Sequence, residues 1–216
     1  MIQLSELHFS SDDGIKVLED VHLHVDRGEM VLVVGPAASG KSILLGLLGT
    51  QVPPQLGQIL VHGRNVARLS RAKLSDLRRQ IGFLPQNFVP LPKTVLENVA
   101  FKLRALGDFR EQAEEKALAA LELVDLTSRL TVPATELEPL DRVRLGLAVA
   151  ICNEPLLLLL DEPFDALATG DQQAVCRLLE QIHLLGHTMV VATRGPLPGE
   201  VRESRIVRLS DGKVME

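Results

Sequence analysis

The feature that most constrains the fold is the segment GPAASGKS at residues 35–42, which lies between two apolar runs. The run before it, Met30–Val34, is fully apolar and typical of a strand buried on both faces. The run after it, Lys41–Leu48, has the pattern of a buried helix. The segment matches G-x-x-x-x-G-K-[ST], a loop whose backbone N–H groups curl around an anion at the positive end of a helix. We therefore predict an α/β fold with a phosphate-binding loop.

Every residue of this loop is assigned to the phosphate site. We expect Lys41 to neutralise the β- and γ-phosphates and the Ser42 hydroxyl to bind Mg²⁺. Ala38 stands where such loops often carry glycine, and its Cβ should weaken nucleotide binding slightly. The predicted nucleotide-binding residues here are Gly35, Pro36, Ala37, Ala38, Ser39, Gly40, Lys41, Ser42 and Ile43.

A second candidate site is acidic and follows the apolar run at residues 156–160. Ligands of open α/β sheets bind at the carboxyl ends of the strands, which is where Asp161 and Glu162 would lie. Asp161 is placed to hold Mg²⁺, directly or through water. Glu162 is placed to orient or deprotonate an attacking water, as a catalytic residue. Two acids can also simply end a strand, but the phosphate loop upstream favours the functional reading.

The chain has 216 residues, enough for one domain in which strands and helices alternate as in a parallel sheet covered by helices. Residues 94–152 differ, because their pattern is helical and contains no convincing strand. Prolines near residues 88–92 and at Pro133 are natural hinges around this part. We predict a core at about 1–87 and 154–216, interrupted by a helical subdomain at about 88–153.

Composition excludes several classes of function. The formal net charge is -5 and no long basic run is present, so the sequence predicts no nucleic-acid partner. The most apolar run has five residues, against the ~20 needed to span a bilayer, so any membrane role is expected to come through a partner. The first residues lack the pattern of a secretory signal, which favours a cytoplasmic protein. Cys152 and Cys176 match no metal spacing and are predicted to be buried thiols.

These segments together resemble the ATP-binding subunits of ABC transporters. The resemblance rests on GPAASGKS, on Gln86 within GFLPQNF and on LLLLLDEP, in this order, and it runs through the whole chain. The opening residues 1–30 and the segment PQNFVPLPKTVLENVAFKL are most similar to the cell-division FtsE group, with the LolD and MacB groups as close alternatives.

The resemblance implies a P-loop NTPase with a RecA-like core, an α-helical subdomain and an N-terminal antiparallel β portion. It also implies ATP and Mg²⁺ as cofactors and a dimer, of two identical or two different subunits, that encloses two ATP molecules. Gln86 would sense the metal and the γ-phosphate while linking to an integral-membrane permease, either FtsX-like or MacB/LolC-like. Such a subunit would lie at the inner face of the cytoplasmic membrane.

The family's signature motif, LSGGQ with close variants, is altered in this chain. The matching residues are Leu137, Glu138, Pro139, Leu140 and Asp141. In the family, this stretch and the helix N-terminus after it grip the γ-phosphate of ATP held by the opposite subunit. Here Glu138 brings negative charge, Pro139 removes an N–H donor and Leu140 adds bulk. We expect this surface to bind phosphate poorly.

Three other family positions are also changed. The switch histidine corresponds to Arg194, which stays cationic and can reach phosphate but cannot accept a proton as a neutral imidazole does. The aspartate that touches the partner subunit corresponds to Ala168. The tyrosine that stacks on adenine corresponds to Ser11, and the nearby Phe9 is more typical of a core residue.

Three functional interpretations therefore stay open. The chain is an ATPase subunit that powers a membrane complex, an ATP-binding regulatory subunit with little hydrolysis, or the altered half of a heterodimer whose other subunit supplies a normal signature. The transported substrate, if there is one, is not predicted by the sequence.

Overall fold

The computed structural model describes residues 1–165, 167–195, 197 and 204–215. A six-stranded sheet has the order β10-β9-β3-β8-β7-β6, with all strands parallel except β10, and a four-stranded antiparallel sheet has the order β2-β1-β4-β5. The strands are β1 (Ile2–Ser10), β2 (Lys16–Val25), β3 (Met30–Val34), β4 (Leu56–Val61), β5 (Arg64–Asn65), β6 (Ile81–Leu84), β7 (Leu157–Asp161), β8 (Thr188–Thr193), β9 (Ser204–Ser210) and β10 (Lys213–Met215).

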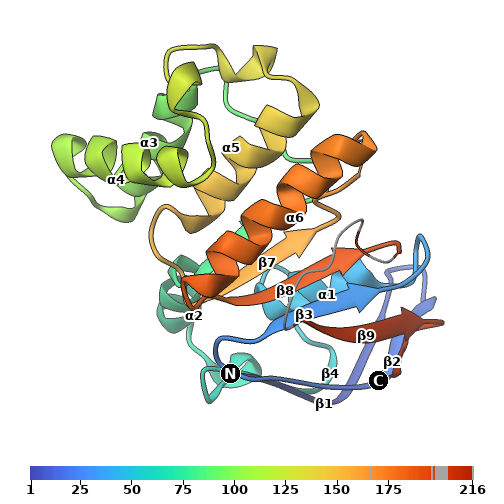
Figure 1. Cartoon of the computed structure of the whole chain (residues 1–216). Helices are drawn as coiled ribbons and strands as arrows, with labels where there is room; N and C mark the ends of the chain where they lie inside the picture. The colour runs from blue at the N-terminus through green and yellow to red at the C-terminus, as the bar shows by residue number, and fades with distance from the viewer. Residues whose placement is uncertain (166, 196, 198–203, 216) are drawn as a thin grey trace.

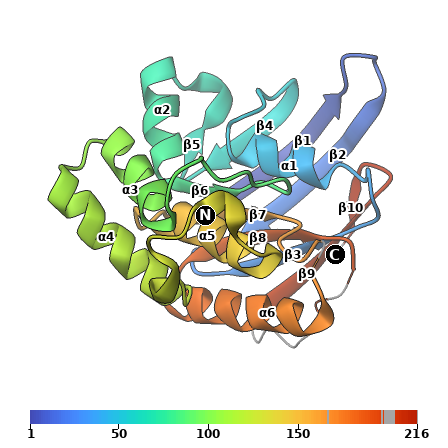
Figure 2. The same ribbon diagram turned by 90° about the horizontal axis from the view of Figure 1, so that it is seen from above.

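Strands β3, β6, β7 and β8 of the six-stranded sheet are buried on both faces, as their apolar runs predict, whereas β9 and β10 are partly exposed. In β3, Val31 and Val33 pack in one hydrophobic core with α1 (Lys41–Leu48), which lies between the two sheets. The alternate residues Met30 and Leu32 pack in a second core with α6 (Thr169–Leu184). Figure 2 shows α1 and α6 on opposite sides of this sheet. Because the side chains on both faces of β3 are buried, its sequence does not alternate between apolar and polar residues.

Residues 88–153 form helices, with one isolated bridge between Thr94 and Pro133. The α-helices are α3 (Val95–Leu106), α4 (Arg110–Leu123) and α5 (Pro139–Ile151), which lie together at one end of the molecule (Figure 1). A capping box between Thr94 and Glu97 begins α3. The buried Asn98 of α3 donates to the carbonyl of Leu91 and accepts from its N–H, which ties the proline-rich segment to the helix. The subdomain boundaries themselves stay a prediction.

Element boundaries differ little from those expected. Met30–Val34 and Lys41–Leu48 have the expected limits. The helix α2 (Arg71–Arg79) begins after Ser70, whose side chain accepts from the N–H of Lys73 as an N-cap.

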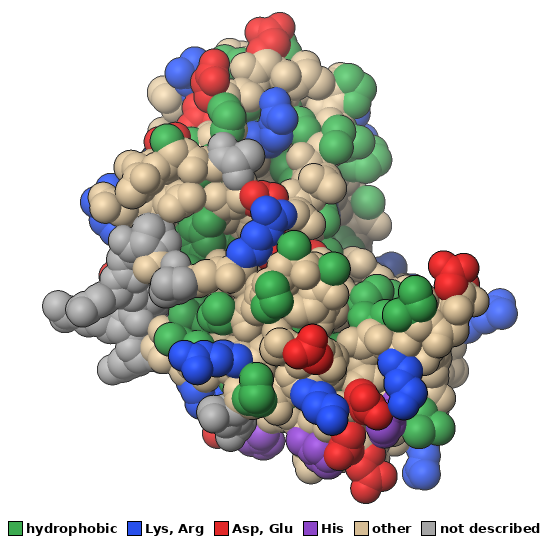
Figure 3. Space-filling model, turned by 90° about the vertical axis from the view of Figure 1, so that its right-hand side faces the viewer, with side chains coloured by type: hydrophobic (Ala, Val, Ile, Leu, Met, Phe, Trp, Pro, Cys, Tyr) green, Lys and Arg blue, Asp and Glu red, His purple; other side chains and the backbone are tan. Residues whose placement is uncertain are grey.

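The surface bears charges of both signs. On the face drawn in Figure 3, acidic and basic side chains are interspersed with hydrophobic ones. The exposed His22 and His24 pair with Asp20 and Asp26, each at 3.0 Å. Both cysteines are buried, as predicted. No helix in the described ranges is both long and apolar enough to span a bilayer.

Candidate nucleotide-binding site

The candidate site forms because four loops follow neighbouring parallel strands. In the order β3-β8-β7-β6, the last residues of adjacent strands are in register: Val34 with Thr193, and Leu84 with Leu160 next to Asp161. The phosphate-binding loop follows β3, Arg194 follows β8, the two acids end β7 and Gln86 follows β6. The sheet alone therefore brings residues that are far apart in sequence to one edge.

A cavity of about 360 Å³ lies at this edge. Most of the predicted site residues line it, together with one that the sequence argument missed, Val17 of β2. The lining consists of Val17, Ala37, Ala38, Ser39, Gly40, Lys41, Ser42, Ile43, Gln86, Glu162 and Arg194. Val17 carried no sequence signal, because a valine in a strand is typical of any core.

Lys41 is the most constrained charge in the site. Its Nζ donates to the carbonyls of Gly35 and Pro36, both at 2.8 Å, and lies 3.2 Å from Oε1 of Glu162. The side chains of Lys41 and Glu162 are only 5% and 9% exposed. Burial of two charges is costly unless they pair and form hydrogen bonds, so each holds the other in place. Gly35 and Pro36 thus act through Lys41 and do not line the cavity themselves.

The loop backbone adopts left-handed conformations at two positions. Gly40, the N-cap of α1, has a φ of 100°, and Ala38 has a φ of 62°. A side chain in this region costs ~1–2 kcal/mol, which glycine avoids. The expected strain at Ala38 is therefore present in the backbone. A Cβ at Gly35 would collide with the carbonyl oxygen of Leu209, so that loop position requires glycine for a different reason, close packing.

Asp161 and Ser42 have the properties of a magnesium site. Burial raises the pKa of Asp161 above its usual value, although the nearby Ser42 hydroxyl and the Lys41 charge act to lower it. Oδ1 of Asp161 is buried and has no protein partner among the described residues. No group of three or more His, Cys, Asp or Glu side chains that could hold a metal ion converges anywhere in those ranges, this site included. Mg²⁺ fits such a site, because it takes few protein carboxylates and completes its shell with phosphates and water.

A chain of polar contacts continues from Glu162 to Gln86. Arg194 Nε lies 3.7 Å from Oε1 of Glu162, and its Nη2 lies 3.1 Å from Oδ2 of Asp165. The same Asp165 oxygen accepts from Nε2 of Gln86 at 3.0 Å. Sequence reasoning did not single out Asp165, although its place three residues after Glu162 is the available signal.

Residues 137–141, which the sequence predicts to be an altered signature, lie at the N-terminus of α5. Glu138 is the exposed N-cap without a side-chain hydrogen bond, and Pro139 occupies the first turn, where proline suits a helix. A second cavity, of about 310 Å³, is lined by Pro139 and Arg142 of α5 and shares Gln86 and Glu162 with the nucleotide cavity.

Two other residues that the sequence analysis singled out, Ala168 and Phe9, have structural roles. Ala168 is the N-cap of α6 and leaves that helix without a side-chain cap. Phe9 packs against the core between the sheets, as expected, and does not line the nucleotide cavity.

A family model described as "ABC transporter" matches residues 18–165, more than half of the chain. The chain belongs to the ABC transporter family. Its ATP-binding relatives include the cell division ATP-binding protein FtsE of Bacillus subtilis, which is 31% identical over 100% of this chain and 95% of that protein. An ABC transporter ATP-binding protein of Thermotoga maritima is 35% identical over 99% and 92% of the two chains.

Other relatives agree with this family. The macrolide export ATP-binding/permease protein MacB of Burkholderia pseudomallei is 33% identical over 95% of this chain, which spans only 32% of that protein. The dimeric structure of MJ0796, a bacterial ABC transporter cassette, superposes with a TM-score of 0.90 at 29% identity and covers 100% of this chain and 97% of the other. The predicted ABC ATPase fold, mixed α/β with an N-terminal antiparallel sheet, is confirmed.

Replacing Ala38 by glycine should stabilise the protein. Relief of the left-handed strain outweighs the added entropy of the unfolded chain, and we expect a gain of up to about 1 kcal/mol, or ~2–4 °C in Tm. The matched control is Ala37→Gly, because the φ of Ala37 is not positive and the same substitution should lower Tm there. A fall in Tm for both variants would contradict strain at Ala38.

Replacing Asp161 by asparagine should raise the stability of the protein but weaken its binding of the metal. Because the folded pKa is raised, this carboxylate destabilises the fold as pH rises through the shifted pKa and at all higher pH. Asp161→Asn should therefore raise Tm by a few degrees at pH 7.5 in EDTA and reduce the increase in Tm that ATP and Mg²⁺ produce. A lower Tm in EDTA, checked by calorimetry, would refute the assignment of a desolvated carboxylate.

Proposed function

We propose that this chain binds ATP together with Mg²⁺ and couples that binding to a transmembrane partner, with slow hydrolysis. The observation that supports this best is the cavity lined by residues 37–43, into which Glu162, Gln86 and Arg194 also project from three other loops. Most of the residues predicted from the sequence line this cavity, with Val17 added as an apolar part of its wall.

The roles of the protein groups follow from charge and burial. Lys41 binds the β- and γ-phosphates, and backbone N–H groups within residues 37–41 cradle them. Mg²⁺ would be held by Ser42, Asp161 and Gln86, where it neutralises phosphate charge. Glu162 orients the attacking water, and its proximity to Lys41 places it close to the γ-phosphate. Arg194 supplies a positive charge in the same subunit but cannot accept the proton.

The face that would contact a second nucleotide-binding subunit supports slow hydrolysis. Glu138 and Pro139 at the start of α5 offer negative charge and one fewer N–H donor to the partner's γ-phosphate. In a homodimer both ATP sites would carry this defect. The same observation favours a second candidate, the altered half of a heterodimer in which another subunit provides a normal signature to the ATP bound here.

The partner is proposed to be an integral-membrane permease of the FtsX or MacB/LolC type, with the chain at the inner face of the cytoplasmic membrane. MacB supports this, because that relative is described as an ATP-binding/permease protein, and this chain covers only 32% of it. The dimeric MJ0796 cassette supports a second nucleotide-binding subunit.

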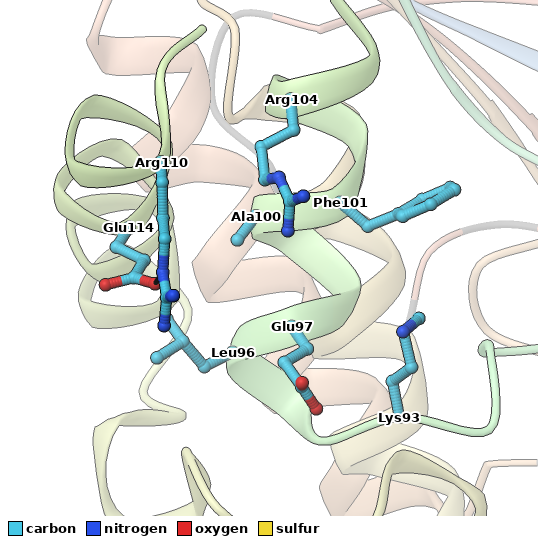
Figure 4. A pocket seen from close by; sticks show the side chains of 8 residues that line it. All are labelled: Lys93, Leu96, Glu97, Ala100, Phe101, Arg104, Arg110 and Glu114. Carbon is cyan, nitrogen blue, oxygen red and sulfur yellow. Dashed lines mark hydrogen bonds and ion pairs between the residues drawn. The ribbon is translucent and has the colours of Figure 1, made fainter.

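A hollow between α3 and α4 is the proposed contact for that permease (Figure 4). Two charged residues in its wall already have hydrogen-bond partners: Glu97 accepts from Thr94, and Arg110 donates to Glu114. Phe101 remains 49% exposed beside Arg104, which gives an apolar anchor next to a positive charge.

Steady-state ATP hydrolysis, with and without the permease, tests the proposed function. We expect turnover well below that of an ABC ATPase with an unaltered signature, and its loss in Glu162→Gln. Addition of a nucleotide-binding subunit with a normal signature should raise turnover if the heterodimer interpretation is correct. If the isolated chain hydrolyses ATP as fast as an ABC ATPase with an unaltered signature, this result would contradict slow hydrolysis.

Replacing Phe101 by aspartate should weaken the permease complex without affecting ATP. The exposed ring contributes little to folding, so ATP affinity should stay within about twofold, while the affinity for the permease falls about tenfold or more. Leu118→Asp on α4, which is 40% exposed outside this hollow, is the matched control. Equal permease binding by wild type and Phe101→Asp in detergent pull-down titrations would exclude this hollow.

A further inference from the structure

We propose that Asp165 is a positioning residue that orients Gln86 and Arg194 toward the nucleotide, a role which rests on the ATP–Mg²⁺ site proposed above. Asp165 belongs to the turn after β7, and its N–H donates to the carbonyl of Glu162 at 3.0 Å. Its backbone is therefore fixed relative to the acid placed beside the γ-phosphate. The side chain extends from there to two other loops.

A single carboxylate oxygen carries both contacts. Oδ2 of Asp165 accepts from Nε2 of Gln86 at 3.0 Å and from Nη2 of Arg194 at 3.1 Å. Gln86 follows β6 and Arg194 follows β8, the strands on either side of β7. Asp165 thus joins the loops of both neighbouring strands from the central one. Glu162 cannot replace it, because its Oε1 already faces Lys41.

The contact decides which way the Gln86 amide faces. An amide has one donor end and one acceptor end, and only the oxygen can bind a metal ion. Because Nε2 donates to the Asp165 carboxylate, Oε1 is the end left to Mg²⁺. Gln86 is an exposed side chain with several rotatable bonds, and without this contact it would have more rotamer and flip freedom to lose on binding.

Arg194 is held in a comparable way. Its Nη2 contacts Asp165, and its Nε lies near Glu162, so the guanidinium is fixed between two carboxylates at the wall of the nucleotide cavity. The side chains of Arg194 and Asp165 are 52% and 38% exposed, and ion pairs this exposed add little to folding stability. The main effect of Asp165 should therefore appear in nucleotide binding.

The test uses the full chain and compares ATP affinity in Mg²⁺ with ATP affinity in EDTA. Calorimetric titrations cover the wild type, Asp165→Ala, Gln86→Ala and the double variant. Asp165→Ala and Gln86→Ala should each reduce the Mg²⁺-dependent gain in affinity by about 3–10-fold, which corresponds to one lost contact. The double variant should lose no more than either single one. In EDTA, Asp165→Ala should weaken ATP binding less than it does in Mg²⁺, because Glu162 still contacts Nε of Arg194.

Further variants separate positioning from structure. Asp165→Asn keeps an acceptor of the same shape and should retain part of the Mg²⁺-dependent gain. Asp76→Ala removes an exposed carboxylate from α2 and should leave the gain unchanged. All variants should melt within about 2 °C of wild type in EDTA without nucleotide, as expected for exposed pairs.

The outcomes distinguish this inference from the proposed function. If the wild type shows no Mg²⁺-dependent gain, the proposed ATP–Mg²⁺ site is wrong. If the wild type shows the gain and Asp165→Ala keeps all of it, or if the losses from Asp165 and Gln86 add in the double variant, the positioning role is overturned.

Discussion

The buried ion pair between Lys41 and Glu162 is the interaction on which the candidate site depends. It joins the loop after β3 to the end of β7 across 3.2 Å, with both side chains nearly free of solvent. The two backbone carbonyls that accept from Lys41 close the loop around the same ammonium. A buried pair of this kind contributes modestly to stability but fixes geometry, because neither charge can leave without exposing the other to an apolar interior. The loop and Glu162, the proposed catalytic residue, are therefore held next to each other.

The parallel sheet supplies the frame for this pair. β3, β8, β7 and β6 are buried on both faces and end at one edge, so short loops from four distant parts of the sequence meet there. Asp161 is desolvated at that edge, with a raised pKa and an oxygen that lacks a protein partner in the described ranges. Function is thus built on groups that weaken the fold slightly, as is common for binding sites.

The sequence predicted the parts of this arrangement that depend on backbone pattern. Burial and strand direction alone predict the fully apolar strands, the glycine-bearing loop and the acids after residues 156–160. The structure places Lys41, Glu162, Gln86 and Arg194 together. Val17 and Asp165 were not predicted. Val17 reads as an ordinary strand residue, and Asp165 acts through side chains 79 and 29 residues away, which no local pattern encodes.

The positions predicted to be altered are each compatible with the fold. Proline suits the first turn of α5, and α6 forms without a capping side chain at Ala168. The fold therefore accommodates the residues for which the sequence predicts a loss of phosphate-binding groups. In the proposed function, nucleotide binding within the chain is separable from phosphate binding across a dimer.

Calorimetric titration of the purified chain with ATP and Mg²⁺, compared with Lys41→Met, tests this account most directly. Methionine keeps the length and the apolar stem but removes the charge held by Gly35, Pro36 and Glu162. Loss of charge-assisted phosphate contacts should weaken ATP binding about 10–100-fold. Equal ATP affinity in the two proteins would contradict the assignment of this cavity as the nucleotide site.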